Sequence, residues 1–515
     1  MADVVVVGAG HNGLVAATLL ARAGLAVEVL ERADVVGGAC RTETPFAAAP
    51  DLRVSTGAYL LGLMPPELIA LLDIDLPLIR RDPHYFLPTL DGRYLLLGGD
   101  AEASARQFAE FFTGVDARAD AALRAELAAL AADLAPAWLH EPLTVEDTAE
   151  RYIRPELRER FVALVRGSAM DYLASFGFAS ELVTAMYAVT DGMPGISGSP
   201  WTPGTGHNLL VHNMCRLPGA DGTWMVVRGG MGTVTRTLAD AAVKAGAVIR
   251  TGTEIAAITT AGGAVTGVST VAGEEISARA VLAATDPYRL PGLLGDACPE
   301  PLRQRIDGYA GRSAGRTLKL NLALSDLPRF AALPEPVGQH GTTVHLLPPP
   351  AADGSVLTAL REAFAAGEAG ALDPLPPVEW YLHSTLDPSL SDVDGRHSSA
   401  LFVQGVPHQP AGTTWDKALP SYVDRLLAFV ETFAPGLSRL VVDTYPLAPP
   451  DVEAHFGITG GNIFHVDNTV SFTDRLPYRT GVAGLYAGSA ATFPAGSVIG
   501  CAGHNSAQAL LADLG

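Results

Sequence analysis

The first forty residues constrain the fold more than any other part of the chain. Residues 4–7 (VVVV) form an apolar run that ends at a glycine and is too short for a helix, so we expect a buried strand. Gly8, Gly10 and Gly13 then form the pattern G-x-G-x-x-G, and residues 14–23 follow with helical periodicity. In a βαβ unit the first glycine permits a tight turn, the second lets a pyrophosphate approach, and the third lets the helix pack on the strand. The sequence therefore predicts a Rossmann-type unit that binds a dinucleotide.

An acidic residue closes the second strand of this unit. Residues 25–30 return as a strand, and Glu31 follows 18 residues after Gly13, where a carboxylate binds a ribose hydroxyl. The intervening helix would present the positive end of its dipole to the phosphates. A carboxylate at this position argues against a 2′-phosphate on the ribose, but the motif alone does not separate NAD from FAD.

Length and charge limit the classes of protein that the chain can belong to. A chain of 515 residues is longer than one hydrophobic core supports, so we expect two domains. The net charge of −20 disfavours nucleic acid and general attraction to anionic membranes, although a local basic or apolar patch could still touch lipid. No run of 18 apolar residues suggests a spanning helix, and the strand at residue 4 leaves no room for a signal peptide, so we expect a cytoplasmic protein.

Cysteine and histidine patterns argue against a metal centre or a dithiol. The four cysteines are scattered without a C-x-x-C pair, and the 13 histidines contain no H-x-x-x-H pair. We therefore expect no structural metal and no disulfide framework.

Features of the nucleotide-binding unit return in the middle and at the end of the chain. A glycine cluster opens a helical pattern over residues 229–245, and strand-like runs follow at 246–250 and 280–285. The chain closes with a strand at 484–488 and a helix from about 498 to 511. These patterns predict a nucleotide-binding fold that is built from three separate pieces of the chain.

The segments between these pieces differ in pattern. Residues 101–135 and 141–190 predict helices, whereas residues 191–223 are dense in glycine and proline and predict an ordered loop without helix or strand. Residues 316–325 (RTLKLNLALS) alternate as a strand, which places Lys319 on the same face as Thr317 and opposite the leucines.

Seven motifs occur in order along the chain: GAGHNGL (8–14), ERADVVGGACRT (31–42), TPGTG (202–206), VRGGMGTV (227–234), KLNLAL (319–324), GGNIFH (460–465) and GLYAGSAATFPAGSVIG (484–500). Together they resemble the phytoene-dehydrogenase-like, carotenoid desaturase branch of the FAD-dependent amine oxidase superfamily. The resemblance covers nearly the full length and is nearest to the subgroup of pyridine nucleotide-disulphide oxidoreductase domain protein 2.

The resemblance implies an α/β fold with a Rossmann-type, glutathione-reductase-like FAD-binding domain in discontinuous segments and an α+β substrate domain. The expected FAD-binding segments are residues 1–75, 225–300 and 466–515. The expected substrate-binding segments are residues 76–224 and 301–465.

FAD is the cofactor that the resemblance implies. Gly37, Gly38 and Arg41 would hold its phosphates and ribityl chain, and the backbone at Ile255 would meet the adenine. Residues 497–499 would open the last helix toward the flavin, where a helix N-terminus stabilises the charge of the reduced ring. With the glycine motif and the acidic turn, the expected cofactor contacts are Gly8, Gly10, Gly13, Glu31, Arg32, Gly37, Gly38, Arg41, Ile255, Gly488, Ser489, Ser497, Val498 and Ile499.

Lys319 is the first candidate for a catalytic side chain. Flavin amine oxidases resemble this layout, with a lysine that holds a water near the flavin N5; a solvated lysine is the alternative. His465 and His207 are further candidates, because both lie in glycine- or asparagine-rich stretches near predicted flavin segments; a satisfied structural histidine is the alternative. Four aromatic residues could line an apolar cavity or simply pack in the core: Tyr59, Trp201, Trp224 and Tyr381.

Four activities remain open, in this order of preference. The first is desaturation of a carbon–carbon bond of a mostly apolar or amphiphilic small molecule by hydride transfer to flavin N5. The second is oxidation of an amine, the third a redox-neutral isomerisation that uses reduced FAD, and the fourth a flavin-binding scaffold without turnover. A second G-x-G-x-x-G with a strand before it is not visible, so we expect oxygen, a quinone or a protein carrier to accept the electrons.

Overall fold

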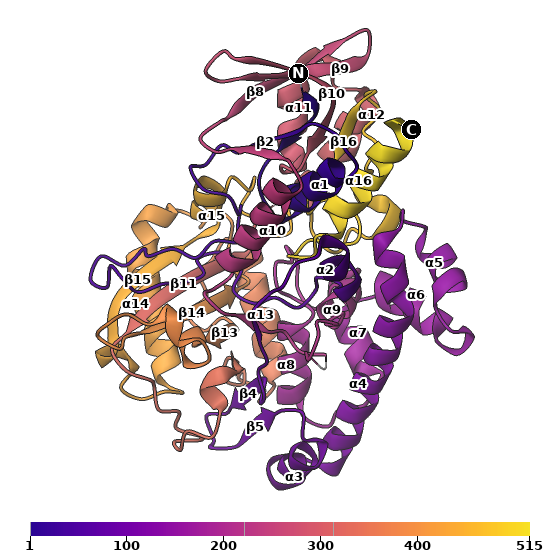
Figure 1. Ribbon diagram of the computed structural model, residues 1–515. Helices are drawn as coiled ribbons and strands as arrows, with labels where there is room; N and C mark the ends of the chain where they lie inside the picture. Colours follow the sequence, from indigo (N-terminus) through magenta and orange to yellow (C-terminus); the bar gives the residue numbers. More distant parts are fainter. Residues whose placement is uncertain (1, 221, 313, 515) are drawn as a thin grey trace.

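Two seven-stranded sheets organise this computed structural model, which describes residues 2–220, 222–312 and 314–514 (Figure 1). The first sheet has the order β7-β2-β1-β10-β9-β8, and β16 pairs with β10 off this path. Strands β1, β2, β7, β10 and β16 are parallel, whereas β8 and β9 form an antiparallel extension. Its strands are β1 (Ala2–Val7), β2 (Val27–Leu30), β7 (Val248–Arg250), β8 (Ile255–Ala261), β9 (Ala264–Thr270), β10 (Glu275–Ala283) and β16 (Leu485–Ala487).

The start, middle and end of the chain meet in this sheet, as an α/β nucleotide-binding fold requires. Helix α1 (His11–Arg22) begins directly after the glycine turn and packs between α10 (Gly232–Lys244) and α16 (Cys501–Leu514). A Cβ on Gly13 would overlap the carbonyl oxygen of Gly8, and a Cβ on Gly503 would overlap that of Asn12. Both glycines are therefore needed for close packing of α1 against its strand and against α16.

The second sheet has the order β15-β11-β14-β13-β12-β4-β5 and is antiparallel except for the β12–β4 pair. On β11 the side chains alternate as the sequence predicts: Leu318, Leu320 and Leu322 join the core beneath α14 (Trp415–Glu431), and Lys319 points to the other face. The remaining strands of this sheet are β4 (Tyr85–Pro88), β5 (Tyr94–Leu97), β12 (Thr343–Leu346), β13 (Val378–Tyr381), β14 (His397–Gln404) and β15 (Val441–Leu447), with β11 at Thr317–Leu324.

Helices from residues 101–212 form one flank of the molecule, drawn in purple in Figure 1. They are α3 (Ala101–Phe111), α4 (Gly114–Leu134), α5 (Val145–Tyr152), α6 (Arg158–Arg166), α7 (Ala169–Ala174), α8 (Glu181–Thr190) and α9 (Thr205–His212). Other elements are α2 (Pro66–Leu72), α11 (Leu290–Leu294), α12 (Glu300–Asp307), α13 (Val356–Glu368), α15 (Pro449–Phe456) and the small sheet of β3 (Leu78–Ile79) with β6 (Val226–Val227). Within the described ranges, no helix has both the length and the apolar composition needed to cross a bilayer.

Two local predictions are wrong. Residues 191–223 were expected to lack helix and strand, but α9 lies within them, because burial of Leu209 and Leu210 outweighs the surrounding glycines and prolines. The last helix begins at Cys501, so residues 497–499 form the turn before it instead of opening it. Ser497 has a φ of 146°, which is incompatible with a helix.

Candidate active site

A cavity of about 490 Å³ runs from the first sheet into the second. Its walls come from the carboxyl ends of β1 and β2, from the turn before α16, and from β11, β12 and β13. Eleven of the predicted cofactor-binding and catalytic residues line it: Gly8, Gly10, Glu31, Arg32, Gly37, Gly38, Ile255, Lys319, His465, Ser497 and Val498.

The glycine turn leaves a cradle at the N-terminus of α1. Gly10 is the N-cap residue of this helix, and a Cβ placed on it would meet no atom within 4 Å. Gly37 lies alongside, donating its N–H to the carbonyl oxygen of Ala9 at 2.9 Å. Free N–H groups, a positive dipole end and space at the second glycine are the features that a pyrophosphate requires.

Backbone donors fix the carboxylate of Glu31 at the edge of this cradle. The N–H of Ala9 donates to one oxygen at 2.8 Å, and the N–H of Ala33 donates to the other at 2.9 Å. Each oxygen retains acceptor capacity for a ribose hydroxyl. Arg32 and Ile255 continue the cavity wall beyond Glu31. The residues present therefore fit the adenosine half of a dinucleotide.

Two half-buried histidines line the cavity: His11 in the first turn of α1 and His465 in the loop after α15. Burial lowers the pKa of His11 to about 4 and also lowers the pKa of His465, so both rings are neutral near pH 7. The His11 ring bonds the backbone of Ser497, while His11 Nε2 and His465 Nδ1 have no hydrogen-bond partner in the described part of the chain. Buried unpaired nitrogens of this kind fit a ligand with polar ring edges, as a flavin has. His11 was missed from sequence because it occupies a variable position of the glycine motif.

Six of the predicted residues do not line the cavity. Gly13 serves helix packing, and a Cβ on Gly488 would lie 2.9 Å from the Leu282 side chain. His207 Nδ1 bonds the carbonyl oxygen of Asn468 at 2.8 Å, which is the environment of a satisfied core histidine. The full set is Gly13, Arg41, His207, Gly488, Ser489 and Ile499.

Lys319 reaches the cavity from the centre of β11 and is 5% exposed. Its Nζ donates to the carbonyl oxygens of Ser55 and of Gly57, the latter at 2.6 Å, and lies 4.7 Å from the centre of the Tyr59 ring. Burial lowers the pKa of this amine well below its ordinary range. Lys319 is thus a buried, partly desolvated amine and not a solvated surface lysine.

The inner end of the cavity is polar. Arg81, Tyr85, Thr343 and Glu379 line it, and none of them was singled out from sequence. They come from β12, β13, β4 and the segment before β4, and no motif links these strands in the chain. Aromatic residues complete the wall: Tyr59, Trp224 and Tyr381 line the cavity as one sequence interpretation suggested, whereas Trp201 stacks with Arg361 elsewhere.

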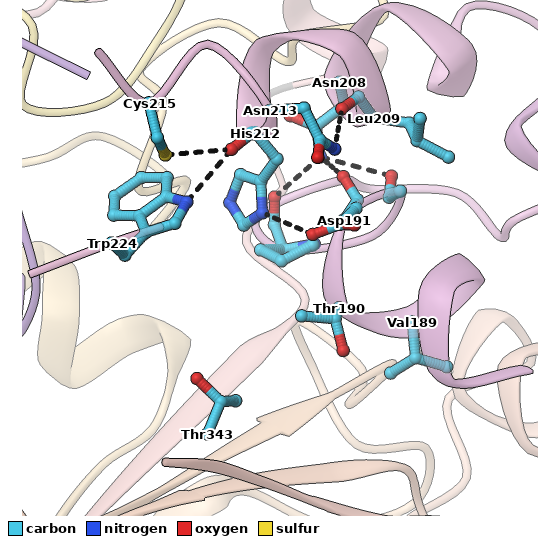
Figure 2. A network of polar contacts seen from close by, with 12 residues as sticks. Val189, Thr190, Asp191, Asn208, Leu209, His212, Asn213, Cys215, Trp224 and Thr343 are labelled. Atoms are coloured by element: carbon cyan, nitrogen blue, oxygen red, sulfur yellow. Dashed lines mark hydrogen bonds and ion pairs between the residues drawn. The ribbon is translucent and has the colours of Figure 1, made fainter. Parts of the chain in front are cut away.

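Hydrogen bonds hold the α8–α9 wall of this chamber in place (Figure 2). Asp191 lies 3.6 Å from His212 Nδ1, and the Trp224 indole donates to the His212 carbonyl at 3.0 Å. Asn208 bonds the carbonyl oxygens that follow α8, so the turn beside Asp191 is fixed.

Comparison with known proteins assigns the family. The flavin containing amine oxidoreductase family matches residues 13–325, and the FAD dependent oxidoreductase family matches residues 228–469. Pyridine nucleotide-disulfide oxidoreductase domain-containing protein 2 of Mus musculus is 33% identical, over 99% of this chain and 94% of its own. Hydroxyneurosporene desaturase of Cereibacter sphaeroides is 28% identical, over 99% of this chain and 98% of its own.

Solved structures confirm the fold. An oxidoreductase from Methanosarcina mazei superposes with a TM-score of 0.62 over 99% of both chains, at 16% identity. The prediction of FAD as cofactor is also confirmed, because both matching families are flavin- or FAD-dependent. This chain is therefore an FAD-dependent oxidoreductase that belongs to the flavin containing amine oxidoreductase family.

Proposed function

We propose that this enzyme removes two hydrogens from adjacent carbons of a small, largely apolar molecule and thereby forms a carbon–carbon double bond. The observation that carries this proposal is the buried amine of Lys319 next to aromatic side chains of the cavity wall. Near it the cavity is lined by Tyr59, Leu60, Phe402, Ile463 and Phe464. The relative named as a desaturase spans the whole chain, which supports the same reaction class.

FAD supplies a hydride acceptor when bound. The first-turn N–H groups of α1, with Gly37 and Gly38, would hold its pyrophosphate, Glu31 its ribose, and the backbone at Ile255 its adenine. The turn at Ser497 and Val498 and the rings of His11 and His465 would contact the flavin.

Lys319 would take the proton in this reaction. A neutral amine that donates its two N–H groups to the Ser55 and Gly57 carbonyls keeps its lone pair for a proton. Lys319 Nζ would take a proton from the substrate carbon next to the one that gives up a hydride, and the electron pair left behind would become the π bond; bound FAD would supply the acceptor for that hydride. Dioxygen, a quinone or a protein carrier would then accept the two electrons.

The aromatic geometry disfavours amine oxidation. An amine nitrogen held between two rings needs a gap between them, but the Tyr59 and Tyr381 ring centres lie only 4.4 Å apart. The buried cation Arg81 at the same end also disfavours a cationic amine.

Anaerobic reduction of the bound flavin tests the proposal. Candidate apolar alkanes, alkenes, alcohols and acids, and amines for comparison, would each be mixed with the oxidised holoenzyme. Reduction would be measured as loss of the visible absorption band of the flavin. We expect a subset of the compounds without an amine to bleach it. Bleaching by amines alone would show C–N oxidation, and turnover only after prior reduction would show isomerisation; either result would overturn the proposal, as would no bleaching at all.

A further inference from the structure

A buried guanidinium at the inner end of the cavity has no anionic partner among the residues that the structure describes. Arg81 is 2% exposed and lines the cavity. Its Nε donates to the Trp224 carbonyl at 2.8 Å, and its Nη1 donates to the Thr343 hydroxyl at 2.9 Å. Nη1 also lies 3.5 Å from the His84 carbonyl oxygen. In the part of the chain that the structure describes, the side-chain hydrogen bonds of Arg81 use Nε and Nη1 and leave Nη2 without one, and no carboxylate lies within ion-pair distance. A buried charge without a counter-ion is costly, so this arrangement is suited to an anion that arrives with a ligand.

Two acidic side chains around this end of the cavity, Glu379 in its wall and Asp191 beside Tyr85, already accept hydrogen bonds from other side chains. Glu379 accepts hydrogen bonds from the Tyr381 hydroxyl and from Gln404 Nε2, the latter at 2.9 Å. Burial raises the pKa of Glu379 to about 8, so the group is largely neutral near pH 7 and does not cancel the charge of Arg81. Asp191 accepts from the Tyr85 hydroxyl at 3.1 Å and faces His212 (Figure 2).

We propose that Arg81 binds a carboxylate on the substrate through its Nη2 group, with the Thr343 hydroxyl as the second donor. This inference rests on the proposed function and names the substrate class of the same site. Thr343 accepts from Arg81, so its own hydroxyl hydrogen is left to donate. The substrate is then an amphiphile, with its acid group at Arg81 and its apolar body beside Tyr59, Phe402 and Ile463.

A carboxylate fits better than a phosphate. Arg81 is the single guanidinium among the described residues that line this end, since Arg32 and Arg289 lie at the adenosine end. One guanidinium and one hydroxyl match the single charge and two oxygens of a carboxylate. A doubly charged phosphate would leave charge and acceptors uncompensated in a buried chamber.

Ligand binding can be read without turnover, so this test is independent of the proposed reaction. The holoenzyme would be titrated with benzoate and decanoate and with the matched amides, and the perturbation of the flavin spectrum would give each Kd. We expect the carboxylates to bind at least about tenfold more tightly than their amides, and Arg81→Gln to abolish that preference. Thr343→Val should weaken carboxylate binding by a few fold and leave amide binding unchanged.

Two further variants keep the test decisive. Arg80→Gln removes a charge at the adjacent, exposed position that pairs with Asp82, and it should leave both Kd values unchanged. If Arg81→Gln does not fold, Arg81→Lys retains the charge but loses the fork of donors, and an intermediate preference is expected. Equal affinity for acid and amide in the wild type, or an undiminished preference in the Arg81 variants, would overturn the inference while leaving desaturation itself intact.

Discussion

At the scale of single residues, the chemistry depends on the environment of Lys319. A lysine at the centre of a buried strand is unusual, and here it exchanges solvent for two carbonyl oxygens and an aromatic face. Burial lowers the pKa of this amine and makes it available as a base.

Replacement of Lys319 by methionine should slow flavin reduction by about 10²–10⁴-fold, because the variant lacks the amine that takes the proton. In the wild type the rate of flavin reduction should rise with pH as the amine deprotonates. The rise should end at a pH lower than the ordinary pKa of a lysine. Stopped-flow reduction across pH checks both effects. Lys417→Met, at an exposed position of α14, is the control and should behave as wild type. An identical pH profile in Lys319→Met would contradict the assignment.

Glu379 predicts a pH dependence of stability. Its pKa is raised to about 8 in the folded protein from an ordinary 4.5, so the folded state holds a proton that the unfolded state has released between these values. Stability should therefore fall as pH rises from about 5 to about 8, by an amount on the order of a few kcal/mol. Glu379→Gln should flatten this part of the profile. Melting temperatures of both proteins across that range are the measurement, and parallel profiles would count against the assignment.

At the scale of elements, two helices meet at one very close contact. Gly503 in α16 lies against the backbone of Asn12 in α1, and this contact joins the last piece of chain to the first. Gly503→Ala should destabilise the fold by about 1–3 kcal/mol, because the new methyl group forces α16 away from α1. Gly114→Ala in α4, where the nearest atom is 3.6 Å from a new Cβ, should be neutral or slightly stabilising. Equal melting temperatures for the two variants would show that the close approach is not needed.

Elements differ in how far sequence could predict them. The β1–α1–β2 unit was predictable because its strand, glycine turn and acidic residue follow one another within about thirty residues. The polar inner chamber was not, because Arg81, Thr343 and Glu379 meet only through pairing of β4, β12 and β13. That pairing depends on packing between segments far apart in the chain, and no local sequence pattern predicts it. The exact domain boundaries stay a prediction.

At the scale of the whole molecule, the cavity extends from the first sheet to the second. Two glycine variants can distinguish loss of cofactor binding from loss of folding. Gly10→Val places its side chain in open space at the cradle and should leave the fold intact while preventing FAD binding. Gly13→Val overlaps the Gly8 carbonyl and should impair folding itself. Circular dichroism and the flavin absorbance of the purified proteins distinguish the two outcomes. If purified Gly10→Val still carries flavin, the pyrophosphate does not bind at this glycine turn.

The most direct test of the central claim is the mass of the product from one anaerobic turnover, compared with the amount of flavin reduced. The account predicts a product two hydrogens lighter than the substrate, with a new carbon–carbon double bond, in a one-to-one ratio to reduced flavin. A product of unchanged mass, or an imine or carbonyl formed from an amine, would contradict it.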